Sequence, residues 1–227
     1  EEALGVLEHD VSGITQAIIE SGKESGDFEG VIRKFVGWVA QHVVPTLVEF
    51  FGEQTARQLA DQGRQADLVV GNNVLAQVPD LKDFVSGLKI ILKPRGVITL
   101  EFPHLACLIR ENQLDTIYHE HFSYFSLHTA ERIFRSHGLP LFDVEELPTH
   151  GGSLRLFARH EEDGTKVLSP RLEVLRRREE SAGLTRPDGY GSFADKVEET
   201  KRKLLEFLIG AKRAGKRVAG YGAPGKG

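Results

Sequence analysis

The densest group of side chains that can exchange a proton lies in the stretch D-T-I-Y-H-E-H-F-S-Y-F-S, residues 115–126. Tyr118, His119, Glu120 and His121 follow one another within it. Histidine changes its charge near neutral pH, and tyrosine and glutamate can orient it or exchange a proton with it. The stretch therefore indicates acid–base chemistry or metal binding, and a polar loop without such a role is the alternative. In an extended segment both histidines would point the same way, and in a helix or turn the geometry would differ; both conformations remain open.

A metal site at this stretch needs a third ligand, such as His150, beside His119 and His121. No cysteine or carboxylate stands at a recognisable spacing from these histidines, and the chain has one cysteine, Cys107. We therefore predict no bound metal here and acid–base use of one histidine.

The overall composition is that of an ordinary globular protein, with 40% hydrophobic and 27% charged residues and a net charge of −4. No basic stripe favours nucleic acid, and no apolar run approaches the roughly 20 residues that cross a bilayer. We predict a cytoplasmic protein that binds neither nucleic acid nor membrane. Because the chain starts at Glu1, lacks methionine and stops at Gly227, we interpret it as a piece of a longer protein.

Strands and helices alternate from residue 45 onward. Apolar runs predict strands at 46–51, 66–71, 97–102, 139–147, 153–159 and 216–222, and those at 66–71 and 97–102 are predicted to be buried. Helical spacing predicts helices at 54–62, 81–91, 129–137 and 193–208, and the charges at 176–180 predict a solvated helix face. The strand–helix–strand unit over 66–102 favours a parallel sheet, and the turn P-T-H-G-G favours a final antiparallel hairpin. This α/β pattern is similar to the Rossmann-like sheet of class I methyltransferases.

Polar residues follow consecutive strands of this predicted sheet. Asn72 and Asn73 come after the strand at 66–71, Glu101 and His104 come at the end of the next, and the stretch 115–126 comes after them. Ligands bind at the carboxyl edge of parallel strands, so this convergence predicts a site. Asparagine pairs also make simple turns, which is the alternative for residues 72 and 73.

A glycine-rich segment, G-Y-G-A-P-G-K-G, ends the chain at residues 220–227. Glycines let the backbone approach a phosphate closely, and Lys226 adds a positive charge. The spacing is not that of a Walker loop, because Gly227 stands where serine or threonine belongs. Phosphate binding and a plain glycine-rich turn both remain open.

Four blocks together resemble the sugar C-methyltransferase family, whose members methylate C-3 of a dTDP-linked 4-keto-deoxysugar with S-adenosylmethionine. They are the Y-H-E-H stretch, H-G-L-P-L-F-D-V-E-E-L-P-T-H-G-G-S-L-R at 137–155, G-N-N-V-L-A-Q-V-P-D-L-K-D-F at 71–84 and the terminal G-A-P-G-K-G. The resemblance covers residues 45–227. It implies a methyltransferase domain at 1–160, a helical connector at 161–215 and the start of a nucleotide-sugar-binding α/β domain at 216–227.

The resemblance also implies roles for individual residues. His121 is the expected base that removes the proton next to the ketone, with Tyr118 and Glu120 in the same pocket. The residues expected at the S-adenosylmethionine are Asn72, Asn73 and the E-x-G-x-x-x-G frame Glu20, Gly22 and Gly26, for which Glu24, Gly26 and Gly30 are an alternative. The residues expected at the nucleotide sugar are His119, His150, Arg155, Ala223, Pro224 and Lys226.

The chain also departs from this family. Gln77 stands where the family has a histidine, and the family's zinc module, which precedes the methyltransferase domain, is absent. Zinc is therefore not expected in this chain. These departures leave two alternatives: a catalytically silent module that binds a nucleotide sugar or a partner, or a methyltransferase for another small molecule.

Overall fold

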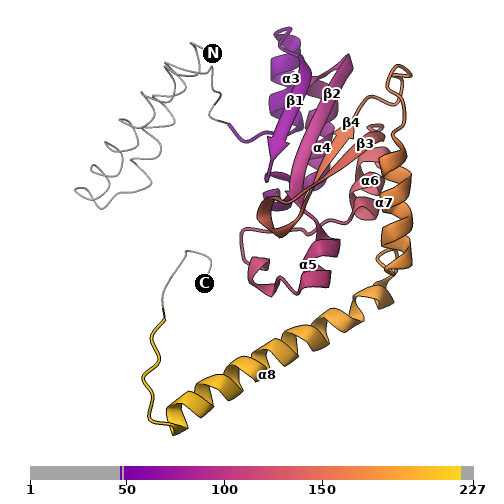
Figure 1. The fold of residues 1–227 in the computed structure, drawn as a ribbon. Helices are drawn as coiled ribbons and strands as arrows, with labels where there is room; N and C mark the ends of the chain where they lie inside the picture. The colour runs from indigo at the N-terminus through magenta and orange to yellow at the C-terminus, as the bar shows by residue number, and fades with distance from the viewer. Residues whose placement is uncertain (1–46, 48, 221–227) are drawn as a thin grey trace, which may run out of the picture. The chain divides into compact units, whose positions relative to one another are not determined.

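The structure is a computed structural model that describes Leu47 and residues 49–220 (Figure 1). The chain divides into two compact units, residues 1–50 and 51–227, and every helix and strand named below belongs to the second. Six predicted site residues lie outside the described residues: Glu20, Gly22, Gly26, Ala223, Pro224 and Lys226.

A four-stranded sheet forms the centre of the second unit, in the order β1-β2-β4-β3 (Figure 1). Its strands are β1 (Ala66–Asn72), β2 (Leu92–Pro103), β3 (Leu141–Leu147) and β4 (Ser153–Ala158). β1 pairs with β2 in parallel, whereas β4 pairs antiparallel with both β2 and β3. The predicted change from parallel pairing to a final hairpin is therefore confirmed.

Five of the six described helices lie where the sequence predicted them, and α5 was not predicted. They are α3 (Glu53–Asp61), α4 (Leu81–Ile91), α5 (Leu105–Glu111), α6 (Leu127–Ser136), α7 (Pro170–Ser181) and α8 (Gly191–Arg213). Short 3-10 turns lie at Leu75–Gln77, Leu114–Thr116, Thr149–Gly151 and Pro187–Tyr190. Side-chain caps fix several helix starts: Asp80 accepts from the amides of Lys82 and Asp83 at α4, and Ser126 accepts from Thr129 at α6.

The sheet register builds the core. Ile98, Leu100 and Phe102 of β2 lie opposite Ala158, Leu156 and Leu154 of β4, and each of these six side chains is at most 1% exposed. Phe84 and Leu88 of α4 and Leu127 and Phe134 of α6 belong to the same core. Full burial of a leucine or phenylalanine side chain is worth about 1.5–3 kcal/mol, so this register is strongly specified.

Three predictions about strands need correction. Residues 49–51 are not in a strand, and Phe50 is fully exposed. Residues 216–220 are not in a strand either. A strand requires a hydrogen-bonded neighbour, and no described strand pairs with either segment. β1 was expected to be buried, but Leu68 and Val70 are 56% and 59% exposed because no described element covers that face.

Candidate active site

A cavity of about 310 Å³ lies where β1 and β2 end. Its walls include Asn73 and Gln77 after β1, Tyr118, Glu120 and His121 of the Y-H-E-H stretch, and His150 between β3 and β4. Segments that are far apart in the sequence meet here because the carboxyl ends of β1 and β2 share one edge of the sheet. The cavity therefore brings together four groups that can exchange a proton: Tyr118, Glu120, His121 and His150.

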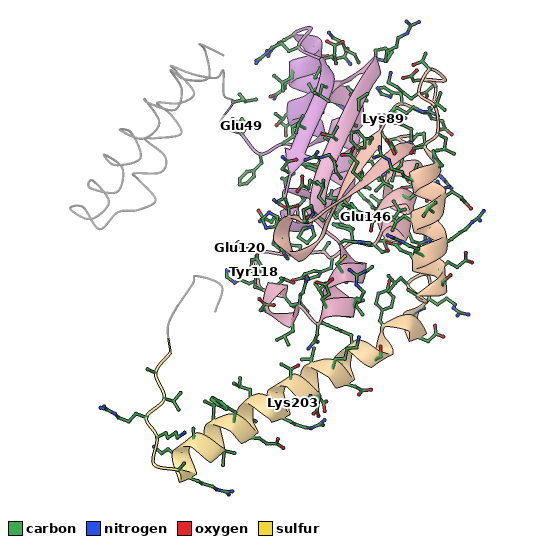
Figure 2. The ribbon with its side chains drawn as sticks, in the orientation of Figure 1. Glu49, Lys89, Tyr118, Glu120, Glu146 and Lys203 are labelled. Carbon is green, nitrogen blue, oxygen red and sulfur yellow. The ribbon has the colours of Figure 1, made fainter. Side chains whose placement is uncertain are left out.

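The Y-H-E-H stretch forms a turn and not an extended segment. The amide of His121 donates to the carbonyl of Tyr118 at 3.1 Å, which brings the two side chains together. The Tyr118 hydroxyl lies 3.1 Å from His121 Nε2, and the ring centroids are 4.4 Å apart. The turn separates the two histidines: His119 is exposed and is not among the residues that line the cavity. Figure 2 shows Tyr118 and Glu120 on neighbouring parts of this turn.

Backbone contacts fix the turn against the segment that follows β1. The amides of Phe122 and Ser123 both donate to the carbonyl of Ala76, at 2.8 and 3.2 Å. Within the turn, the amide of Tyr118 donates to the Tyr124 hydroxyl at 3.2 Å. The turn is therefore held at both ends, which restricts the positions available to His121 and Tyr118.

Asn73 and His150 contact each other across the cavity wall, although they are 77 residues apart in the chain. Asn73 Nδ2 lies 2.9 Å from His150 Nε2. Both residues have a left-handed backbone, with φ of +55° and +52°. Gly151 and Gly152, at φ +79° and +118°, continue the same turn, which explains the glycine pair after His150. Asn72, in contrast, is exposed and does not line the cavity.

Glu101 lies on β2, outside the cavity lining that contains Asn73 and His150, and it is 5% exposed. Its carboxylate accepts from Thr149 Oγ1 and from Arg155 Nη2, each at 2.8 Å. Burial raises the pKa of Glu101, but hydrogen bonds from Thr149 and Arg155, with the charges of Arg155 and His150, lower it below its usual value. Glu101 is therefore ionised at neutral pH. Arg155, expected at the substrate, instead pairs with Glu101 and, at 3.6 Å, with Glu145.

His104 was expected to contribute to the same edge, but it does not line the cavity. The side chain is 3% exposed, and its Nε2 lies 2.8 Å from Glu179 Oε1. The Glu179 carboxylate also accepts from the amides of Leu127 and His128, at 2.7 and 2.9 Å, where α6 begins. A carboxylate is favourable at a helix N-terminus because the helix dipole is positive there.

Glu179 belongs to the charged run 176–180 that was predicted to be a solvated face, yet it is 2% exposed. A signal for this burial was present in the sequence. Leu172, Leu175 and Glu179 stand at helical spacing, and all three are buried on one side of α7. The charged residues around Glu179 obscured this pattern.

Among the residues that the structure describes, no group of three histidines, cysteines or carboxylates is arranged to hold a metal ion. In the same part of the chain, no helix is both long enough and apolar enough to cross a membrane. Asn73 Oδ1 is buried and has no hydrogen-bond partner. Buried acceptors are nearly always satisfied, so this atom fits a ligand that brings an N–H or O–H group, as S-adenosylmethionine does.

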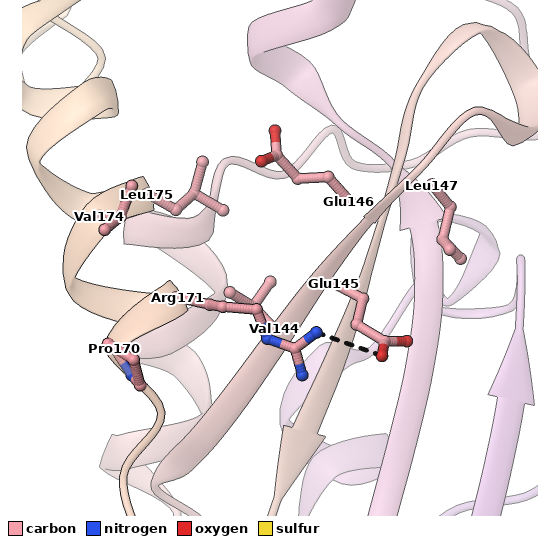
Figure 3. A pocket seen from close by; sticks show the side chains of 8 residues that line it. All are labelled: Val144, Glu145, Glu146, Leu147, Pro170, Arg171, Val174 and Leu175. Atoms are coloured by element: carbon pink, nitrogen blue, oxygen red, sulfur yellow. Dashed lines mark hydrogen bonds and ion pairs between the residues drawn. The ribbon is translucent and has the colours of Figure 1, made fainter.

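A larger cavity of about 630 Å³ lies between β3 and α7 (Figure 3), and none of its lining residues belongs to the Y-H-E-H turn. It is lined by apolar side chains and by Arg171, which pairs with Asp143 and, at 3.3 Å, with Glu145. It contains no histidine, and its charged groups Arg171, Glu145 and Glu146 all have ion-pair partners. The smaller cavity is therefore the better candidate for chemistry, because proton-exchanging groups converge there.

The chain is similar in sequence to known methyltransferases. Residues 16–144 match the family described as "Methyltransferase domain", and residues 148–227 match "C-methyltransferase C-terminal domain". C-methyltransferase NovU of Streptomyces niveus is 36% identical over 195 residues, which cover 86% of this chain and 46% of that protein. The chain thus spans about half the length of this relative.

Solved structures of methyltransferases are also similar over part of the chain. A methyltransferase from Anabaena variabilis is 14% identical, with a TM-score of 0.39, over 51% of this chain and 57% of that one. The 1,6-didemethyltoxoflavin-N1-methyltransferase of Burkholderia thailandensis is 17% identical, with a TM-score of 0.35, over 44% and 45%. The two family matches together cover nearly the whole described sheet. They confirm the resemblance seen in the sequence. The chain therefore belongs to the S-adenosylmethionine-dependent C-methyltransferase family.

Proposed function

We propose that the protein transfers a methyl group from S-adenosylmethionine to a carbon next to the ketone of a nucleotide-linked keto-deoxysugar. The observation that carries the proposal is the Tyr118–His121 pair beside a cavity at the carboxyl ends of β1 and β2. A carbon must become a nucleophile before it takes a methyl group, and loss of a proton next to a ketone achieves this. A histidine suits that proton transfer at neutral pH.

The mechanism assigns separate tasks to the residues of the turn. His121 removes the proton from the substrate carbon, and the C–H electron pair forms an enolate. Tyr118 holds the imidazole through the contact at Nε2, and Glu120 supports the pocket. S-adenosylmethionine, when bound, would supply the methyl group on a positively charged sulfur and would leave as S-adenosylhomocysteine, because the bond from sulfur to the methyl carbon breaks as the new carbon–carbon bond forms. The ketone is restored, and His121 passes its proton to solvent.

The remaining predicted residues form two groups in this proposal. Asn73, with Asn72 and the frame Glu20, Gly22 and Gly26, holds the cofactor. His150 acts on the sugar side, and Ala223, Pro224 and Lys226 bind the diphosphate. His119 and Arg155, which were expected at the sugar, are not assigned to it here, because neither lines the cavity. Support for the first group is the buried, unsatisfied Asn73 Oδ1, and support for His150 is its place in the cavity wall. The proposed domain limits stay at 1–160, 161–215 and 216–227.

Calorimetry on the full-length protein with S-adenosylhomocysteine and with dTDP tests the two binding steps separately. We expect saturable binding of both, and failure to bind either would refute the proposal. Deuterium wash-in at the carbon next to the ketone then tests the chemical step. Exchange should occur with the wild-type protein and stop in His121→Ala, while His119→Ala, changed at an exposed neighbour, should still exchange.

A catalytically silent binding module is the second candidate, and Gln77 favours it. Gln77 lines the cavity at the place where the family has a histidine, so one group able to exchange a proton is missing from the wall. This candidate predicts dTDP binding without deuterium exchange. Exchange and methyl transfer on another small molecule would instead indicate a related methyltransferase.

A further inference from the structure

We propose that Glu101, paired with the partly buried Arg155, is a positioning residue that holds Asn73 and His150 in the cavity wall. This inference rests on the proposed function, because it assigns the pair a task in the same reaction. Neither Glu101 nor Arg155 lines the cavity, so both act through other residues. The geometry connects the turn after β1 and the β3–β4 hairpin to one residue of β2, Glu101, through its backbone carbonyl and its carboxylate.

Glu101 contacts both turns that form this wall. Its backbone carbonyl accepts from the amide of Asn73 at 2.8 Å, which holds the turn after β1. Its carboxylate accepts from Thr149 Oγ1 at 2.8 Å, which holds the residue directly before His150. The Asn73–His150 contact at 2.9 Å then closes the connection between the two turns.

Both turns need such support because their backbones are strained. Asn73 and His150 adopt left-handed φ values of +55° and +52°, a conformation that residues with a Cβ seldom adopt. Strained residues of this kind persist only where their surroundings hold them. Glu101 supplies a hydrogen bond to the Asn73 turn and another to the His150 turn.

Arg155 keeps the carboxylate in place. Its guanidinium lies 2.8 Å from Glu101 Oε2 and 3.6 Å from Glu145 Oε2, so it ties β4 to both neighbouring strands. A Glu101→Gln side chain has nearly the same shape, but it cannot offer Arg155 a charged acceptor while it accepts from Thr149. We therefore expect this substitution to loosen the Thr149–His150 turn without opening a large cavity.

The test compares Glu101→Gln with Glu131→Gln. Glu131 is 8% exposed and pairs with Arg176 at 2.9 Å between α6 and α7, and it does not line the cavity. It is therefore a matched control, because it too pairs a buried glutamate with a partly exposed arginine. The measurements are thermal unfolding, kcat and KM for methyl transfer, and the imidazole ¹⁵N chemical shifts of His150.

We expect both variants to unfold at lower temperature, and only Glu101→Gln to shift the His150 resonances and to lower kcat by about tenfold or more, with a smaller change in KM. Unchanged His150 resonances would overturn the proposal even if kcat fell, because Glu101 would then act directly. Shifted resonances with an unchanged kcat would also overturn it. An equal loss of kcat in Glu131→Gln would show that general destabilisation is responsible.

Two outcomes need a second variant or a second measurement: a Glu101→Gln protein that does not fold, and a wild-type protein without methyl transfer. If Glu101→Gln does not fold, Arg155→Lys replaces it, since lysine keeps the charge but loses the planar geometry of the guanidinium. If the wild-type protein transfers no methyl group, the proposed function fails, whereas the His150 resonances still show whether Glu101 positions that residue.

Discussion

His104 and His121 both follow β2, yet their surroundings differ completely. His104 is 3% exposed, with Nε2 at 2.8 Å from the Glu179 carboxylate and Nδ1 at 3.7 Å from Cys107 Sγ. His121 is only partly buried, and it lines a cavity with the Tyr118 hydroxyl at 3.1 Å. The first ring is enclosed between α5 and α7, whereas the second is accessible to a ligand.

The difference shows that residue type alone does not define an active-site histidine. The Glu179 carboxylate is 2% exposed and accepts from His104 and from two amides of α6, so it joins a strand end, a helix start and α7. Such a buried, fully bonded cluster stabilises the fold. The cavity beside His121 offers the space that a substrate needs, so we expect substitutions at the two places to separate stability from activity.

The largest effect should follow from His121→Ala. Loss of a positioned acid or base typically costs about 10²–10⁴-fold in rate, so kcat should fall by that factor. The free energy of unfolding should change little, because the side chain is only partly buried. Steady-state kinetics and urea unfolding measure the two quantities. His119→Ala is the control, and an equal loss of kcat there would contradict the assignment of the base.

Glu179→Ala should have the opposite profile. Removing one partner of a buried pair costs about 3–5 kcal/mol, and three donors would lose their acceptor here. Urea unfolding should show this loss, while the folded fraction keeps its affinity for S-adenosylhomocysteine. The neighbouring exposed Glu180→Ala should stay within about 0.5 kcal/mol of wild type. A loss of less than about 1 kcal/mol in Glu179→Ala would mean that water satisfies the donors.

Ser126→Ala sharpens the comparison at the start of α6. Ser126 Oγ accepts from the amide of Thr129 at 3.2 Å, as an ordinary helix cap. Its loss should cost about 1 kcal/mol, less than the loss of Glu179, because it leaves one neutral donor without its acceptor. Chemical unfolding of both variants measures the difference. Equal losses would show that Glu179 acts only as a second cap.

The smallest expected effect is the change in the free energy of unfolding when Glu101 is protonated at low pH. The folded protein lowers the pKa of this carboxyl below 4.5, so ionised Glu101 stabilises the fold above the pKa of the unfolded chain. That stabilisation is lost as the pH falls below 4.5 and through the lower, folded pKa. Unfolding free energies measured from about pH 6 to about pH 3 should therefore fall more steeply for wild type than for Glu101→Gln. Parallel curves would contradict the direction of the shift.

Much of the local structure follows from the sequence alone. Apolar spacing defines α4 at 81–91 and the hairpin of β3 and β4, because burial of one face requires the period of a helix or a strand. The Y-H-E-H and H-G-G-S-L-R blocks indicated the C-methyltransferase family, which the comparisons confirm. The roles of individual site residues stay predictions, and six of those residues lie outside the described part.

Only the tertiary structure decided which polar side chains meet. Spacing in the chain did not show that a turn brings His121 to Tyr118 and leaves His119 exposed, or that Asn73 reaches His150 across 77 residues. It also did not show that His104 is enclosed by Glu179. Local periodicity reports which face of an element is apolar, whereas hydrogen bonds between distant polar groups depend on how strands pair and where their ends converge. The Y-H-E-H stretch contains the reactive groups, and the fold selects the histidine that faces the cavity.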